Sequence, residues 1–170
     1  VAFIGWIVVR YSRTYLDGET RQSFFTIWLL ATLAAVLLLV QSGNLVQFVV
    51  AWIGTSLCLH RLLLFYPGRI GAHRAARKKF VTARTGDAAL IGAAILLVVT
   101  YGTTGISEIL AQARLGEGGL QAAFAAALLA LAALLKSAQF PTHGWLTEVM
   151  ETPTPVSALI HAATMVTAGV

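Results

Sequence analysis

The sequence predicts an all-α, polytopic transmembrane helix bundle, and three observations predict it. Of the 170 residues, 58% are apolar and only 11% are charged, so polar side chains are too few to cover a soluble domain of this length. The apolar residues gather in long uncharged blocks such as 23–40 and 120–135, and a bilayer core of ~30 Å needs about 20 helical residues. No alternating strand pattern appears, and open sheet edges cannot be satisfied in lipid.

Six spans follow one another along the chain. A tight turn at 41–44 joins the second span to the third, Pro67-Gly68 ends the third, and Gly102 stops the fourth. A short stretch at 106–115 is expected to lie along the membrane surface. Both ends look cut, because the chain starts and stops inside apolar runs, so we expect 1–170 to be a fragment of one transmembrane domain. The expected spans are 1–14 (partial), 23–41, 45–66, 79–101, 119–140 and 155–170 (partial).

The net charge of +5 is explained by topology. Five basic residues lie at 69–79, between two spans, where a short basic loop is the usual cytoplasmic marker. The connection at 15–22 then faces the cytoplasm as well, and the turn at 41–44 faces outward. We therefore expect contact with membrane lipid and no nucleic-acid binding. The single cysteine, Cys58, gives no disulfide framework and no cysteine metal site.

Lys136 is the most informative residue of the sequence. It follows a long uncharged run and precedes Pro141, and a lysine inside a span costs about 3 kcal/mol unless it is paired, hydrated or neutral. Burial disfavours the charged form, so the proton can leave. One interpretation is a helix end whose lysine reaches the headgroups. The other, which we favour, is a helix broken after Lys136 within the membrane, because broken helices line ion sites.

Two further groups of polar residues lie within the spans. Arg84 and Asp87 are three residues apart, on one helical face, where they form either a simple intrahelical pair or a site in which Asp87 is the counter-ion of Lys136. His161 lies on a polar stripe with Ser157 and Thr164. A histidine there is either a satisfied hydrogen-bonding residue or a proton relay.

The remaining candidates are auxiliary. His60 interrupts the third span, and Glu148 and Glu151 form either a solvated face or the carboxylates at the mouth of a cavity. The sequence contains no phosphate-binding loop, metal cluster or hydrolytic triad. We therefore expect no catalytic site, no metal site and no cofactor in this chain.

The run from Lys136 to Val170, which begins Lys-Ser-Ala-Gln-Phe-Pro and includes Thr-Pro-Thr-Pro-Val-Ser-Ala-Leu-Ile-His, resembles one superfamily closely. It is similar to the antiporter-like membrane subunits of respiratory complex I and of the multisubunit cation/proton antiporters. The segment from Lys79 to Asp87 resembles the neighbouring helix of the same superfamily. This resemblance implies that Lys136 and His161 transfer protons, and it implies the same role more weakly for Asp87.

One departure from the superfamily pattern lies in the third span. Complex I subunits of this kind carry Trp-Glu-Gly there, and the glutamate pairs with the lysine, whereas this sequence has Trp52-Ile53-Gly54. The carboxylate that modulates the lysine is therefore absent. His60 lies seven residues further on, two turns along the same face, and is a candidate for a replacement polar role.

The segments 10–18, 56–67 and 76–80 resemble the membrane subunit of the Dab-type inorganic carbon transporter. That resemblance implies a multi-pass subunit of the bacterial inner membrane that passes cations, either protons or sodium ions, with protons favoured. It also implies a soluble, carbonic-anhydrase-like partner subunit that carries zinc. The run His161-Ala-Ala-Thr-Met favours the complex I type instead, so a proton-pumping subunit of a respiratory NADH:quinone oxidoreductase, or of a cation/proton antiporter, is the alternative.

Overall fold

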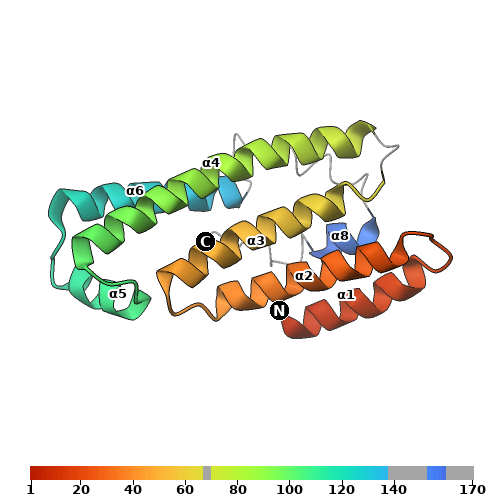
Figure 1. Ribbon diagram of the computed structural model, residues 1–170, viewed down its shortest axis with the longest axis horizontal. Helices are drawn as coiled ribbons and strands as arrows, with labels where there is room; N and C mark the ends of the chain where they lie inside the picture. Colours follow the sequence, from red (N-terminus) through yellow and green to blue (C-terminus); the bar gives the residue numbers. More distant parts are fainter. Residues whose placement is uncertain (67–69, 138–152, 160–170) are drawn as a thin grey trace.

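The computed structural model describes residues 1–66, 70–137 and 153–159, and the regular elements in those ranges are helices (Figure 1). Four of them are long and apolar enough to cross a membrane: α2, α3, the 76–101 part of α4, and α6. The expected fold class is therefore confirmed. The helices are α1 (Ala2–Tyr15), α2 (Gln22–Val40), α3 (Leu45–Leu63), α4 (Ile70–Tyr101), α5 (Ile106–Arg114), α6 (Gly119–Lys136) and α8 (Thr154–Leu159).

The helix boundaries differ from the expected ones mainly at the start of α4. We expected a basic loop up to residue 78, but the chain is helical from Ile70 onward. Alanine, arginine and lysine are strong helix formers, and the segment 72–80 contains neither proline nor glycine. The basic residues therefore extend a membrane helix instead of forming a loop. At the other end, Gly102 has a φ of +66° directly after α4, which is the expected stop.

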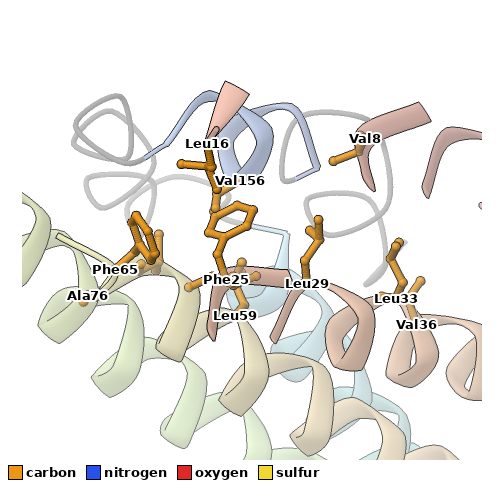
Figure 2. Close-up of a cluster of buried hydrophobic side chains, with 12 residues drawn as sticks. Val8, Leu16, Phe25, Leu29, Leu33, Val36, Leu59, Phe65, Ala76 and Val156 are labelled. Carbon is orange, nitrogen blue, oxygen red and sulfur yellow. The ribbon is translucent and has the colours of Figure 1, made fainter. Parts of the chain in front are cut away.

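The first four helices lie side by side in chain order, α6 runs along α4, and α8 packs against α1 (Figure 1). A cluster of buried apolar side chains joins α1, α2, α3 and α8. Figure 2 shows Phe25 of α2 in this cluster, with Val156 of α8 and Leu59 of α3 close by. The Phe25 ring also meets the Phe65 ring edge-on, with centroids 5.2 Å apart. This cluster fixes α3, the helix that contributes most to the candidate site, against the N-terminal helices.

At the opposite end of the bundle, the turn before α3 is tied to the connection after α4. Leu45 N donates to Thr104 O at 2.8 Å, and Asn44 Nδ2 donates to Thr104 Oγ1 at 3.1 Å. Asn44 also caps α3, because its Oδ1 accepts from Val46 N at 2.8 Å. The tie sets the relative position of α3 and α4.

A small residue lets α6 approach α4 closely. A Cβ placed on Gly86 would lie 3.4 Å from Leu135 Cβ and 3.7 Å from Ala132 O. Ala132 is itself buried in this contact. The C-terminal turn of α6, which ends in Lys136, is thereby brought against the middle of α4.

Candidate functional site between α3, α4 and α6

The α6 helix ends at Lys136, and Ser137 after it has left the helical conformation. This agrees with the break expected after Lys136, although Pro141 and the rest of 138–152 lie outside the described residues. The Lys136 side chain reaches Trp52 and Thr55, which lie near the centre of the 19-residue helix α3. A spanning helix has its centre near the midplane of the membrane, so this geometry favours an ammonium at membrane depth over one in the headgroups.

The Lys136 ammonium has three contacts on α3. Nζ donates to Trp52 O at 3.1 Å and to Thr55 Oγ1 at 3.0 Å, and it lies 4.6 Å from the centroid of the Trp52 ring. A carbonyl, a hydroxyl and an aromatic face all stabilise a positive charge without neutralising it. The site therefore holds an ammonium by neutral groups.

The Thr55 hydroxyl suits both protonation states of Lys136. In the structure Thr55 Oγ1 donates to Trp52 O at 2.8 Å while it accepts from Lys136. A hydroxyl can rotate, so it can donate to a neutral amine once the proton has left. Trp52 O can only accept, so Thr55 is the contact of Lys136 that accommodates proton loss.

Arg84 and Asp87 form the ion pair that their spacing predicts. Arg84 Nη2 lies 2.5 Å from Asp87 Oδ2, and Asp87 is buried in the middle of α4. The guanidinium also lies over the Phe80 ring, 5.3 Å from its centroid. Gly86, which precedes Asp87, packs against Leu135, which precedes Lys136, so the carboxylate and the lysine come from adjoining positions of α4 and α6. The structure therefore brings Asp87 and Lys136 into electrostatic range, with Arg84 as the direct partner of the carboxylate.

Ile53 lies where the superfamily pattern has its glutamate. Its side chain packs against a buried apolar cluster that includes Ala89, Leu90 and Ala132, from α4 and α6. An isoleucine there adds apolar contact and brings no charge. The carboxylate closest to the expected role is therefore Asp87, which comes from α4 instead of α3.

Sequence reasoning missed Lys79 as a site residue and counted it with the basic segment. Lys79 is only 6% exposed, and its Nζ donates to Ser56 O at 2.7 Å and to Ser56 Oγ at 3.3 Å. A signal was present, because Lys79, Ala83 and Gly86 lie on the α4 face on which small residues admit another helix. Its neighbour Lys78 is exposed. The two lysines therefore differ only in the side of the helix on which they lie.

The other candidate residues are further from Lys136 or outside the described residues. His60 packs against the Phe80 ring, with centroids 5.1 Å apart, and lines a pocket of about 430 Å³ together with His73 and Arg74. It is not among the residues that line the small cavity beside Lys136, and its replacement role stays a prediction. His161, Glu148 and Glu151 lie outside the described residues, and their roles stay predictions.

A helix-ending lysine at mid-depth, an adjacent Arg–Asp pair and an all-helical bundle are features of ion-translocating membrane subunits. The family model for the NADH:quinone oxidoreductase/Mrp antiporter transmembrane region matches residues 42–170. The chain belongs to this family of membrane proteins.

Among curated proteins, the chain is 47% identical to the probable inorganic carbon transporter subunit DabB of Hydrogenovibrio crunogenus, over 95% of this chain and 32% of the relative. It is 48% identical to the probable subunit DabB2 of Halothiobacillus neapolitanus, over 95% of this chain and 30% of the relative. Subunit L of NADH-quinone oxidoreductase from Pseudomonas aeruginosa is 39% identical over 100% of this chain and 28% of its own length. The chain thus spans about a third of the relatives that it matches, and within the family it is DabB-like.

Solved structures give the same result for the fold. The Mrp complex from Dietzia contains a chain that matches 98% of this chain with a TM-score of 0.88 and 38% identity, over 18% of that chain. The membrane-bound sulfane sulfur reductase, an archaeal respiratory membrane complex, matches 99% of this chain and 27% of its own with a TM-score of 0.79. At 20% identity the second likeness concerns the fold alone. The relatives are subunits of multisubunit membrane assemblies.

Proposed function

We propose that this chain is part of the cation-translocating membrane subunit of an energy-coupled inorganic carbon transporter, and that the cation is the proton. The observation that carries the proposal is the identity of 47–48% to two DabB subunits, against 39% to oxidoreductase subunit L. Ile53 in place of the glutamate supports the same branch. The sequence resemblance adds a bacterial inner-membrane location and a soluble, zinc-carrying, carbonic-anhydrase-like partner subunit.

Lys136 is the proposed proton-transfer residue. Its amine is held by a carbonyl, a rotatable hydroxyl and a ring face, so both its charged and its neutral form have partners. Asp87 supplies a negative charge on the neighbouring helix, and Arg84 partly offsets that charge by pairing with Asp87. Movement of Arg84 toward or away from Asp87 changes the electrostatic field at Lys136. A conformational change elsewhere in the protein that moves Arg84 is therefore one way to control proton release.

The test uses the full-length protein with its soluble partner in a bacterial host that lacks its own inorganic carbon uptake. Growth in air and uptake of labelled inorganic carbon are measured. Lys136→Ala is expected to abolish uptake, and Lys136→Arg is expected to fail as well, because arginine keeps its charge and cannot release the proton. Lys78→Ala, which changes an exposed lysine, is the matched control and is expected to retain uptake.

Two results would contradict the proposal. Normal uptake with Lys136→Arg would show that the charge is merely structural. Absence of uptake by the unsubstituted pair, together with rescue of NADH-driven quinone reduction in a mutant lacking the oxidoreductase subunit, would establish the respiratory alternative.

A further inference from the structure

A second buried lysine binds the same turn of α3 as Lys136. Lys79 comes from α4 and binds the carbonyl and the hydroxyl of Ser56, the residue that follows Thr55. Lys136 comes from α6 and likewise binds one carbonyl and one hydroxyl. Two amines from different helices thus approach the same short segment of α3 with the same kinds of partner.

Between the two lysines lies a small cavity of about 30 Å³, lined by residues of α3, α4 and α6. A cavity needs about 10–15 Å³ of this kind of volume to hold a water molecule, provided that polar partners are present. Ser56, Lys79, Thr82 and Lys136 are among its lining residues and carry polar groups. The cavity therefore has the size and the lining for a water that bridges the two lysines. Its lining residues are Ser56, Leu59, Lys79, Thr82, Ala83, Leu135 and Lys136.

On the side of Lys79 that faces the basic end of the bundle, the next titratable residue of α3 to consider is His60. His60 lies one turn of α3 after Ser56, the partner of Lys79, and its Nδ1 is buried without a hydrogen-bond partner among the described residues. His60 also lines the pocket of about 430 Å³ whose other walls include His73, Arg74 and Arg77. His60 therefore stands between the α3 contact of Lys79 and a wide pocket at the start of α4, where the basic residues lie.

A purely structural interpretation of Lys79 is that its ammonium ties α4 to α3. It explains the two hydrogen bonds, but a neutral donor would make them without placing a charge among apolar side chains. It does not explain why the lysine adjoins a cavity shared with Lys136. A lysine near a span end ordinarily reaches out to the headgroups, whereas this one turns inward to α3.

We propose that Lys79 is a second proton-transfer residue, which exchanges a proton with Lys136 through a water in the shared cavity and passes it toward the pocket lined by His60. The step moves one proton: the Lys136 ammonium becomes an amine, and the Lys79 amine becomes an ammonium, so no oxidant or reductant is needed. The proposal rests on the proposed function, because it concerns the path of the same proton.

The charges around Lys79 support exchange of a single proton. Two ammonium groups facing one small cavity repel each other, so simultaneous charging is disfavoured, and arrival of a proton on one lysine promotes its loss from the other. In the superfamily, a glutamate at the position of Ile53 modulates the lysine by attraction. In this chain, a second lysine modulates it by repulsion. The titratable or charged groups on the helices around Lys79 are Cys58 and His60 of α3, Arg84 and Asp87 of α4, and Lys136 of α6.

The experiment reconstitutes the full-length protein and its partner in vesicles that contain a pH-sensitive dye, and it measures inorganic carbon uptake and proton flux from pH 6 to pH 9. Lys79→Gln, which keeps a donor to Ser56, is expected to lower both at least tenfold. Lys79→Arg is expected to do the same, because it keeps the charge but cannot release a proton. Lys79→His is expected to retain part of the flux with its optimum moved to lower pH, because an imidazole ordinarily titrates about four units below an ammonium.

Lys78→Gln is the matched control on the exposed side of the same helix. The melting temperature of each purified variant shows whether it folds; if Lys79→Gln does not, the comparison of Lys79→Arg with Lys79→His decides. The inference is overturned if Lys79→Gln or Lys79→Arg takes up inorganic carbon as fast as the unsubstituted protein. It is also overturned if the proton flux of Lys79→His is as low as that of Lys79→Arg at every pH. No proton-coupled uptake by the unsubstituted protein would instead overturn the proposed function.

Discussion

Among single residues, the core of the site is two lysines held by neutral partners on α3. Lys136 and Lys79 each bind a backbone carbonyl and a hydroxyl, and among the described residues of the site the ion pair is that of Arg84 with Asp87. Neutral partners stabilise an ammonium less than a direct carboxylate does. Such lysines lose and regain protons more readily than lysines fixed in salt bridges, which suits proton transfer.

The role of the Thr55 hydroxyl can be tested directly. Thr55→Val keeps the shape of the side chain but removes the hydroxyl that accepts from Lys136 Nζ at 3.0 Å. Loss of one such hydrogen bond costs about 1–3 kcal/mol when the donor is charged, so we expect proton-coupled uptake to fall about fivefold or more. Thr55→Ser retains the hydroxyl and is expected to keep most of the rate. Equal rates in Thr55→Val and the unsubstituted protein would show that the hydroxyl is not used.

At the scale of elements, α3 is the common support and α4 and α6 each bring one lysine to it. The close contact of α6 with α4 at Gly86 positions Lys136, because Leu135 immediately precedes it. The tie between Asn44 and Thr104 sets α3 against α4 at the far end. The site therefore depends on the spacing of three helices, not on a local motif.

The helix spacing can be tested at Gly86. Gly86→Leu places side-chain atoms where Leu135 and Ala132 lie, so α6 must shift and carry Lys136 away from α3. We expect uptake to fall at least tenfold, with Gly86→Ala showing a smaller loss. Ala88→Leu makes a similar change on the exposed face of α4 and is expected to leave uptake unchanged. Equal uptake in Gly86→Leu and Ala88→Leu would contradict the close contact.

At the scale of the whole molecule, basic residues gather at the end of the bundle that holds the α1–α2 connection and the start of α4 (Figure 1). The opposite end holds the 41–44 turn and α5, where Arg114 is the basic residue. Basic residues mark the cytoplasmic side of membrane proteins. The pocket lined by His60 and Arg74 therefore opens toward the cytoplasm in the orientation that we expect.

This orientation can be tested by labelling single cysteines in a Cys58→Ala background. Gln41→Cys and Glu117→Cys place exposed thiols at one end, and Glu19→Cys places one at the other. An impermeant maleimide added to intact spheroplasts is expected to label the first two, and in inverted vesicles it is expected to label the third. Labelling of Glu19→Cys and Gln41→Cys from the same side would contradict the arrangement of the spans.

The amino-acid sequence alone predicts the helical membrane class, the 41–44 turn, the end of α4 at Gly102 and the Arg84–Asp87 pair. These features are local: an apolar run sets a span, a glycine sets a stop, and a spacing of three sets a shared helical face. The end of α6 at Lys136 was also predictable, from the lysine and the proline that follows it. The family resemblance directed attention to the same residue.

Helix packing, and not the local sequence, sets which of two adjacent lysines turns inward. Lys78 and Lys79 have the same chemistry, and the difference is that Lys79 meets Ser56 across the α3–α4 contact while Lys78 is exposed. The cavity shared with Lys136 likewise arises from three helices that are separate in the sequence. The physical reason is that the cost of burying a charge depends on the groups that the fold places around it, and those groups come from segments that no local pattern relates.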